Sequence, residues 1–212
     1  MFKNIYSFYQ NLIRQLANIS GLAPLLLRLI VAPVLIQAGW TKFSSFDSTV
    51  SWFGNSDWGL GLPLPALLVS LTIAAELVGG VLLLLGLLTR LVAIPLMITM
   101  LVAIFTVHLP YGWPAIADTS SWLADGTILL NERVMASGEK IEAARSLLQQ
   151  HGNYEWLTSS GKLVILNNGI EFAAIYFAML LSLLFTGGGR FVSLDYWLKR
   201  YVSHNPTLVA GR

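Results

Sequence analysis

Long apolar segments separated by short polar stretches dominate the chain. They cover residues 22–40, 64–88, 91–109 and about 169–185, and the polar run Asn167-Asn168-Gly169 blurs the start of the last one. A helix that crosses the hydrocarbon core of a bilayer, which is roughly 30 Å thick, needs about 20 mostly apolar residues. The pattern therefore predicts four transmembrane helices.

Both ends of the chain have apolar residues at helical spacing with polar or basic residues between them. The N-terminal set is Ile5, Phe8, Tyr9, Leu12, Ile13, Leu16 and Ile19, and the C-terminal set is Leu194, Trp197, Leu198 and Tyr201. This spacing is typical of helices that lie in the membrane interface and contact lipid. The alternative is that both ends are frayed polar tails.

A longer polar stretch, residues 110–166, interrupts the apolar pattern before the fourth segment. Within it, residues 131–150 have the spacing of a helix that stops at His151-Gly152. Residues 154–158 and 162–166 have the pattern of a small β-hairpin. Six of the seven tryptophans would lie on the same side of the membrane as this stretch: Trp40, Trp52, Trp58, Trp113, Trp122 and Trp156. They indicate either an interfacial aromatic belt or an aromatic docking face.

These elements together predict one all-α domain, a polytopic four-transmembrane-helix bundle with amphipathic terminal helices and a mixed external loop region. Small residues at Ala75, Gly79 and Gly80 allow helices to approach closely, so we expect a tight bundle and not a channel. The predicted parts are a cytoplasmic interfacial helix at 1–20, transmembrane helices one to three at 21–109, an external (periplasmic) insertion at 110–166, transmembrane helix four at 167–189 and a cytoplasmic amphipathic tail at 190–212.

Basic residues set the expected orientation. The turn Leu88-Thr89-Arg90 is so short that the second and third helices must form a hairpin, which places successive loops on alternating sides. One side then carries Lys3, Arg14, Arg90, Arg190, Lys199, Arg200 and Arg212 with a single acid, Asp195. By the positive-inside rule this side is cytoplasmic, so we expect both termini inside the cell. Because the basic residues border apolar segments, the net charge of +2 indicates membrane topology and not nucleic-acid binding.

The chain has no cysteine. Thiol redox relays, zinc-thiolate sites and iron-sulfur clusters on this chain are therefore excluded. Haem held by two histidines is not expected either, because His151 falls in the predicted external loop and His204 in the predicted cytoplasmic tail.

Ionisable residues inside the apolar segments are the first candidates for function. Each charged group in a bilayer costs about 2.5–3.5 kcal/mol on insertion scales, so it is expected to have a partner. Arg28 lies in the first segment and Glu76 in the second, and their long side chains could nearly reach each other. An Arg28–Glu76 pair would be either a structural clamp or part of a ligand or proton site, and the sequence leaves both readings open.

A second polar group is predicted at the outer ends of the helices. Gln37, Lys42, His108 and Glu171 would form a small vestibule there if their helix faces agree. The alternative for His108 is a hydrogen-bonded structural histidine.

Met97, Met100 and His108 are spaced to share one face of an α-helix. Thioether and imidazole ligands suit copper(I), so this face is a candidate metal site. Methionine, however, is more often a packing residue.

Several stretches, taken in order, resemble the DoxX family of small bacterial four-helix membrane proteins. They are LLLRLIVAPVLIQAGWTKF, GLPLPALLVSLTIAAELVGGVLLLLGLLTRLVA, MLVAIFTVHLPYG and NNGIEFAAIYFAMLLSLLFTGGGRFVSLD. The resemblance includes Arg28, Lys42, Glu76, Arg90 and His108. It implies a bacterial inner-membrane protein associated with terminal quinol oxidases, thiosulfate:quinone oxidoreductases or other membrane redox complexes. The long external insertion resembles members that accompany the biosynthesis of copper-binding modified peptides.

Three functions follow as hypotheses. The first is an inner-membrane accessory subunit of a redox or copper-peptide maturation system, which docks a membrane or periplasmic protein partner through its external loops. The second is a quinone-binding oxidoreductase subunit, in which Arg28 and Glu76 contact the quinone oxygens or handle protons. The third is a small-solute or ion transporter. Quinone and copper are the cofactors these hypotheses imply, self-association into a homo-oligomer stays open, and the sequence does not decide whether the chain is catalytic.

Overall fold

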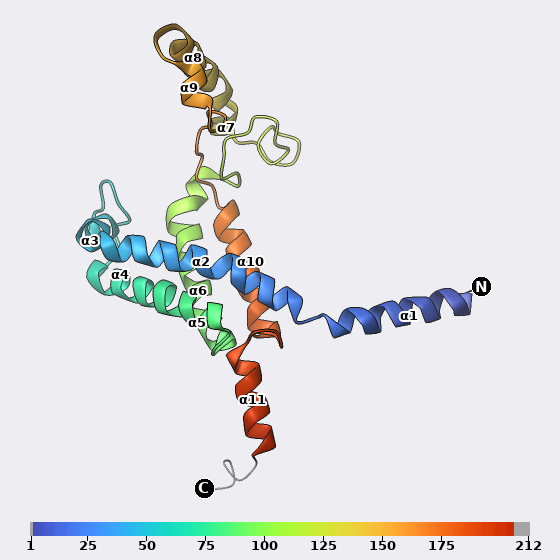
Figure 1. Cartoon of the computed structure of the whole chain (residues 1–212). Helices are drawn as coiled ribbons and strands as arrows, with labels where there is room; N and C mark the ends of the chain where they lie inside the picture. The colour runs from blue at the N-terminus through green and yellow to red at the C-terminus, as the bar shows by residue number, and fades with distance from the viewer. Residues whose placement is uncertain (1, 206–212) are drawn as a thin grey trace. The chain divides into compact units, whose positions relative to one another are not determined.

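A computed structural model describes residues 2–205, and this part of the chain contains helices and two isolated β-bridges but no strand. It divides into two compact units, whose described residues are 2–99 with 176–205, and 100–175. The elements, labelled in Figure 1 where there is room, are α1 (Phe2–Asn18), α2 (Leu22–Ser44), α3 (Phe46–Gly54), α4 (Pro65–Ile73), η1 (Ala74–Val78), α5 (Gly79–Leu85), α6 (Thr89–Ala103), η2 (Ile104–His108), η3 (Leu109–Tyr111), α7 (Glu132–Met135), α8 (Ser137–His151), α9 (Tyr154–Thr158), α10 (Glu171–Thr186) and α11 (Leu194–His204). The all-α prediction is confirmed.

Within residues 2–205, three helical stretches are long and apolar enough to cross a membrane. They are Leu22–Ser44, Pro65–Leu85 and Thr89–Tyr111, and each has 21 or 23 residues. At 1.5 Å per residue they measure about 32–35 Å, which matches a hydrocarbon core of about 30 Å. The first three predicted spans therefore have the required length and composition.

The helix of the fourth predicted span is shorter than the predicted range 167–189. Helix α10 has 16 residues, about 24 Å, and a bilayer accommodates such a helix by thinning or through its flanking residues. The helix begins at Glu171 because the residues before it have another conformation: Asn168 has a positive φ of 65°, and Gly169 packs against carbonyl oxygens of residues 112–114.

The helices of the first unit pack through glycine. Figure 1 shows α2 beside the continuous stretch α4–η1–α5. A Cβ atom at Gly39 would lie 2.8 Å from the backbone nitrogen of Leu77, and one at Gly80 would lie 2.7 Å from the Ile36 side chain. Close approach through Gly79-Gly80 was predicted, and the structure confirms it.

The insertion between the third and fourth apolar segments is helical where a hairpin was predicted. Residues 154–158 form α9, because the Asn153 side chain caps the helix by accepting a hydrogen bond from the Trp156 N–H at 3.2 Å. The hairpin prediction is therefore wrong. The predicted helix at 131–150 is confirmed as the pair α7 and α8, capped at its start by Asn131.

Both terminal amphipathic segments are helical. Helix α1 has no buried residue, so its apolar side chains are exposed, as the interfacial prediction requires. Helix α11 ends at His204, and the last residues of the predicted tail at 190–212, including Arg212, lie outside the described residues. Lipid contact by either helix stays a prediction.

Candidate functional site

A buried carboxylate lies where a π-helical turn interrupts the second span. Glu76, which as a whole residue is 3% exposed, belongs to η1, the five-residue π-turn between α4 and α5. Such turns contain i→i+5 hydrogen bonds and frequently occur at functional sites. The turn packs against Gly39 of α2, where an added Cβ would lie 3.1 Å from the Glu76 Cβ. The glycine thus lets α2 approach the backbone around the carboxylate.

Lys42 is the partner of this carboxylate. Its Nζ atom donates a hydrogen bond to Glu76 Oε2 at 2.6 Å, and the exposed fractions of the two side chains are 26% for Lys42 and 4% for Glu76. Lys42 lies in the last turn of α2, and its ammonium reaches the buried carboxylate of η1. An ammonium has three N–H donors, and the bond to Glu76 uses one of them. The pair can therefore donate hydrogen bonds to a ligand oxygen and exchange a proton with it.

The predicted Arg28–Glu76 pair is wrong. Arg28 is fully buried, and its guanidinium donates to the carbonyl oxygens of Leu84 at 3.1 Å, Phe191 at 3.0 Å and Val192 at 3.1 Å. Leu84 lies in the last turn of α5, where the unpaired carbonyls and the helix dipole favour a cation. Of the two readings proposed for Arg28, the structure supports a clamp, but one made with backbone and not with Glu76.

The turn between the second and third spans is held by a distant carboxylate. Asp195 of α11 accepts hydrogen bonds from the N–H groups of Leu88 at 2.7 Å and Thr89 at 2.9 Å. These are free donors at the start of α6, so Asp195 caps this helix from another part of the chain. The Ser193 hydroxyl donates to the carbonyl of Gly86 at 3.1 Å. We call this assembly of Arg28, Gly86–Thr89 and residues 191–195 the basal junction.

In the second unit, two of the predicted vestibule residues hold backbone segments together. His108 Nδ1 lies 2.8 Å from the carbonyl oxygen of Asn168, and Glu171 Oε2 accepts from the Ala115 N–H at 2.9 Å. Buried Asn167 reinforces them by donating to the carbonyls of Tyr111 and Pro114. The structure therefore gives His108 and Glu171 structural partners.

The other two vestibule residues, Gln37 and Lys42, belong to the first unit, where Gln37 is exposed on α2 and Lys42 binds Glu76. A vestibule formed by all four stays a prediction.

The spacing argument for a copper site changes with the structure. It assumed α-helical geometry from Met97 to His108, but residues 104–108 form the π-turn η2, which changes the register. The common face therefore does not follow from the spacing. Within residues 2–205, no group of three or more histidine, cysteine, aspartate or glutamate side chains could hold a metal ion. Copper binding by Met97, Met100 and His108 stays a prediction.

Comparison with known proteins finds a family-model match for part of the chain. Residues 23–109 match the DoxX family model. We call this matched stretch the DoxX segment. It contains Arg28, Lys42, Glu76, Arg90 and His108, so the predicted resemblance is confirmed over α2 to η2. The insertion, α10 and Asp195 lie outside the match.

One similar protein is named "Putative oxidoreductase CatD" and comes from Bacillus subtilis strain 168. It is 36% identical to this chain over 85 residues, which are 40% of this chain. The chain spans 59% of the length of this relative. No solved structure matches the chain significantly.

Sequence reasoning missed three contributors to these sites. Gly39 gave no signal, because a single glycine in an apolar helix does not reveal which backbone it approaches. Asp195 and Ser193 bind the turn at Gly86–Thr89 from more than 100 residues away, at separations of 106 and 107 residues. A capping pattern in the local sequence could not have found them.

Proposed function

We propose that this chain is a membrane subunit of a redox system and that its Lys42–Glu76 pair binds a quinone headgroup and exchanges protons with it. The observation that carries this proposal is the 2.6 Å ion pair on a buried π-helical turn within the DoxX segment. The similarity to a protein named as an oxidoreductase supports a redox association. The basic flanks of the spans support placement in a bacterial inner membrane with the N-terminus and α11 on the cytoplasmic side.

The chemistry of the pair fits this role. Reduction of a quinone to a quinol takes up two electrons and two protons, and the electrons would come from a partner redox subunit. The Lys42 ammonium can donate a hydrogen bond to a quinone oxygen, which stabilises the negative charge that develops there. Lys42 can then donate its proton to that oxygen and be reprotonated from water by way of the Glu76 carboxylate, and a second cycle delivers the second proton. The pair is neutral as a whole, so the resting site holds no net charge in the membrane.

Replacement of Glu76 by glutamine tests this proposal. The amide keeps the size and a hydrogen bond to Lys42 but cannot carry a proton, so we expect quinol turnover in native membranes to fall about a hundredfold. Glu171→Gln is the matched control, because that carboxylate binds a backbone N–H outside the pair. Quinone content of the purified protein is measured in parallel. Unchanged turnover in Glu76→Gln, with no quinone retained by the unmodified protein, would exclude the quinone role.

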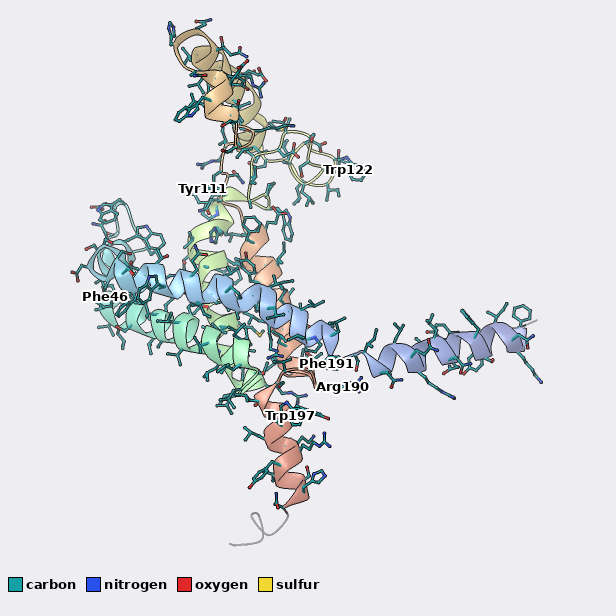
Figure 2. The ribbon with its side chains drawn as sticks, viewed as in Figure 1. Phe46, Tyr111, Trp122, Arg190, Phe191 and Trp197 are labelled. Atoms are coloured by element: carbon teal, nitrogen blue, oxygen red, sulfur yellow. The ribbon has the colours of Figure 1, made fainter. Side chains whose placement is uncertain are left out.

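We also propose that the loop at residues 116–130 docks a partner protein. It carries exposed apolar side chains, among them Trp122, which is 68% exposed, with Ile128 and Leu130. The loop is ordered by its own backbone bonds, since Ile128 and Leu129 both donate to the Trp122 carbonyl. Figure 2 shows Trp122 projecting from this loop. Exposed apolar groups on an ordered loop suit a partner protein with an apolar surface, such as a periplasmic redox or copper-peptide maturation protein.

Photo-crosslinking separates protein docking from lipid contact. With benzoylphenylalanine at position 122 and the proteins of neighbouring genes co-expressed, we expect one defined protein adduct. The same probe at Leu147, an exposed position on α8, should give none. Lipid adducts alone, or equal patterns at both positions, would contradict docking.

The docking role also requires the loop to lie outside the cell. Because the chain has no native cysteine, Ser120→Cys should react with an impermeant maleimide in intact spheroplasts, whereas Ser203→Cys should react only after permeabilisation.

A further inference from the structure

The basal junction borders a cavity that the proposed function does not use. Its volume is about 500 Å³, and it lies among the start of α6, the end of α10 and the first turns of α11. Two cationic side chains line it, Arg90 from α6 and Lys199 from α11, together with the Thr186 hydroxyl, the Tyr196 ring and the Asp195 carboxylate.

The charge of this cavity favours an anion. Among the described residues, Asp195 is the only acid that lines it, and both of its oxygens already accept backbone N–H groups. Arg90 donates one N–H group to the Phe185 carbonyl at 3.0 Å, so its other N–H groups can bind a ligand. Within residues 2–205, the ion pairs are Lys42–Glu76 and Arg145–Glu142, so neither Arg90 nor Lys199 forms an ion pair with an acid, and the two cations outnumber the one lining carboxylate.

The position of the cavity relative to the bilayer indicates which anion it binds. The turn at Gly86–Leu88 joins two candidate membrane spans, so it lies at one boundary of the bilayer, where phospholipid phosphates are found. Leu88 and Leu91 also line the cavity and are 51% and 63% exposed, which provides an apolar edge for acyl chains. A soluble anion would gain nothing from this edge.

We propose that the cavity between Arg90 and Lys199 binds the phosphate of an anionic phospholipid headgroup. The two cations approach the phosphate oxygens, and the exposed leucines contact the acyl chains. This site is independent of the quinone proposal, because it shares no residue with the Lys42–Glu76 pair.

Neighbouring cations on α11 provide a matched test. Lys199 lines the cavity, whereas Arg200 lies next to it in the sequence and stacks over the Trp197 ring at 5.8 Å instead. Each substitution by glutamine removes one positive charge from the same helix. The full-length protein in mild detergent is titrated with dihexanoyl phosphatidylglycerol, and binding is followed by native mass spectrometry and by thermal stabilisation.

We expect Lys199→Gln to weaken phosphatidylglycerol binding about fivefold, with an unchanged melting temperature in the absence of lipid, and Arg200→Gln to leave binding within twofold. Dihexanoyl phosphatidylcholine should not compete. Equal loss in the two variants would show general attraction to a basic helix and would overturn the site. Equal binding of sn-glycerol 1-phosphate would overturn the assignment to lipid in favour of a soluble phosphate ester.

Discussion

Replacing Arg28 by methionine should destabilise the protein by about 3–5 kcal/mol, because it leaves three carbonyl groups in the basal junction without their donor. Methionine has a similar length and fits an apolar environment, so the loss reports the missing hydrogen bonds and not a cavity. For a chain of this size the expected fall in melting temperature is about 10 °C. Thermal unfolding of the purified protein in mild detergent measures it.

Two further variants make this result specific. Lysine at position 28 keeps the charge but lacks the planar guanidinium that reaches α5 and residues 191–192 together, so it should recover only part of the lost stability. Methionine at Arg190, whose exposed guanidinium stacks over Phe191 at 5.1 Å, should cost no more than about 1 kcal/mol. Equal effects at positions 28 and 190 would mean that the buried guanidinium is not what holds the junction.

The membrane-spanning part of the fold could be predicted because its cause is local. A run of apolar residues long enough to cross a bilayer must form a helix there, since every backbone group needs a hydrogen bond. The short turn before Arg90 likewise required a tight hairpin. The same reasoning overestimated the fourth span, because Asn168 and Gly169 interrupt the helix with a left-handed residue and a close backbone packing.

The candidate site could be predicted only in part, since charge in an apolar segment identifies residues but not their partners. Arg28, Lys42 and Glu76 were all candidates, yet the prediction paired Arg28 with Glu76 because their long side chains could nearly reach each other. It treated every ion as needing an opposite ion and overlooked backbone carbonyls as partners. Two of the Arg28 acceptors are 163 and 164 residues away in the sequence, and no local sequence pattern predicts them.

Local backbone geometry explains the other misses. A π-turn adds one residue to a helix without changing its apolar character, so η1 and η2 are invisible in the hydrophobic pattern. The polar run at Asn167-Asn168-Gly169 was the one available signal. It marked the segment that binds residues 111–115, although it was interpreted only as an indistinct helix start.

Removing Lys42 alone should be more harmful than removing both members of the ion pair, by about 1 kcal/mol. Lys42→Met leaves the Glu76 carboxylate buried without a cation, and breaking a buried pair in this way costs about 3–5 kcal/mol. Glu76→Gln leaves Lys42, whose side chain is 26% exposed, able to reach water, so its cost should be about 1 kcal/mol. The double variant should be more stable than Lys42→Met, with a coupling energy of about 2 kcal/mol from melting curves.

The double variant also separates a structural clamp from a reactive site. If the pair only neutralises two charges inside the membrane, Lys42→Met/Glu76→Gln should restore quinol turnover along with stability, since its neutral groups fill the same space. If the pair exchanges protons with a quinone, stability should recover while turnover stays about a hundredfold below that of the unmodified protein. The proton-exchange role requires the second result. Joint recovery of stability and turnover would assign the Lys42–Glu76 pair to folding alone.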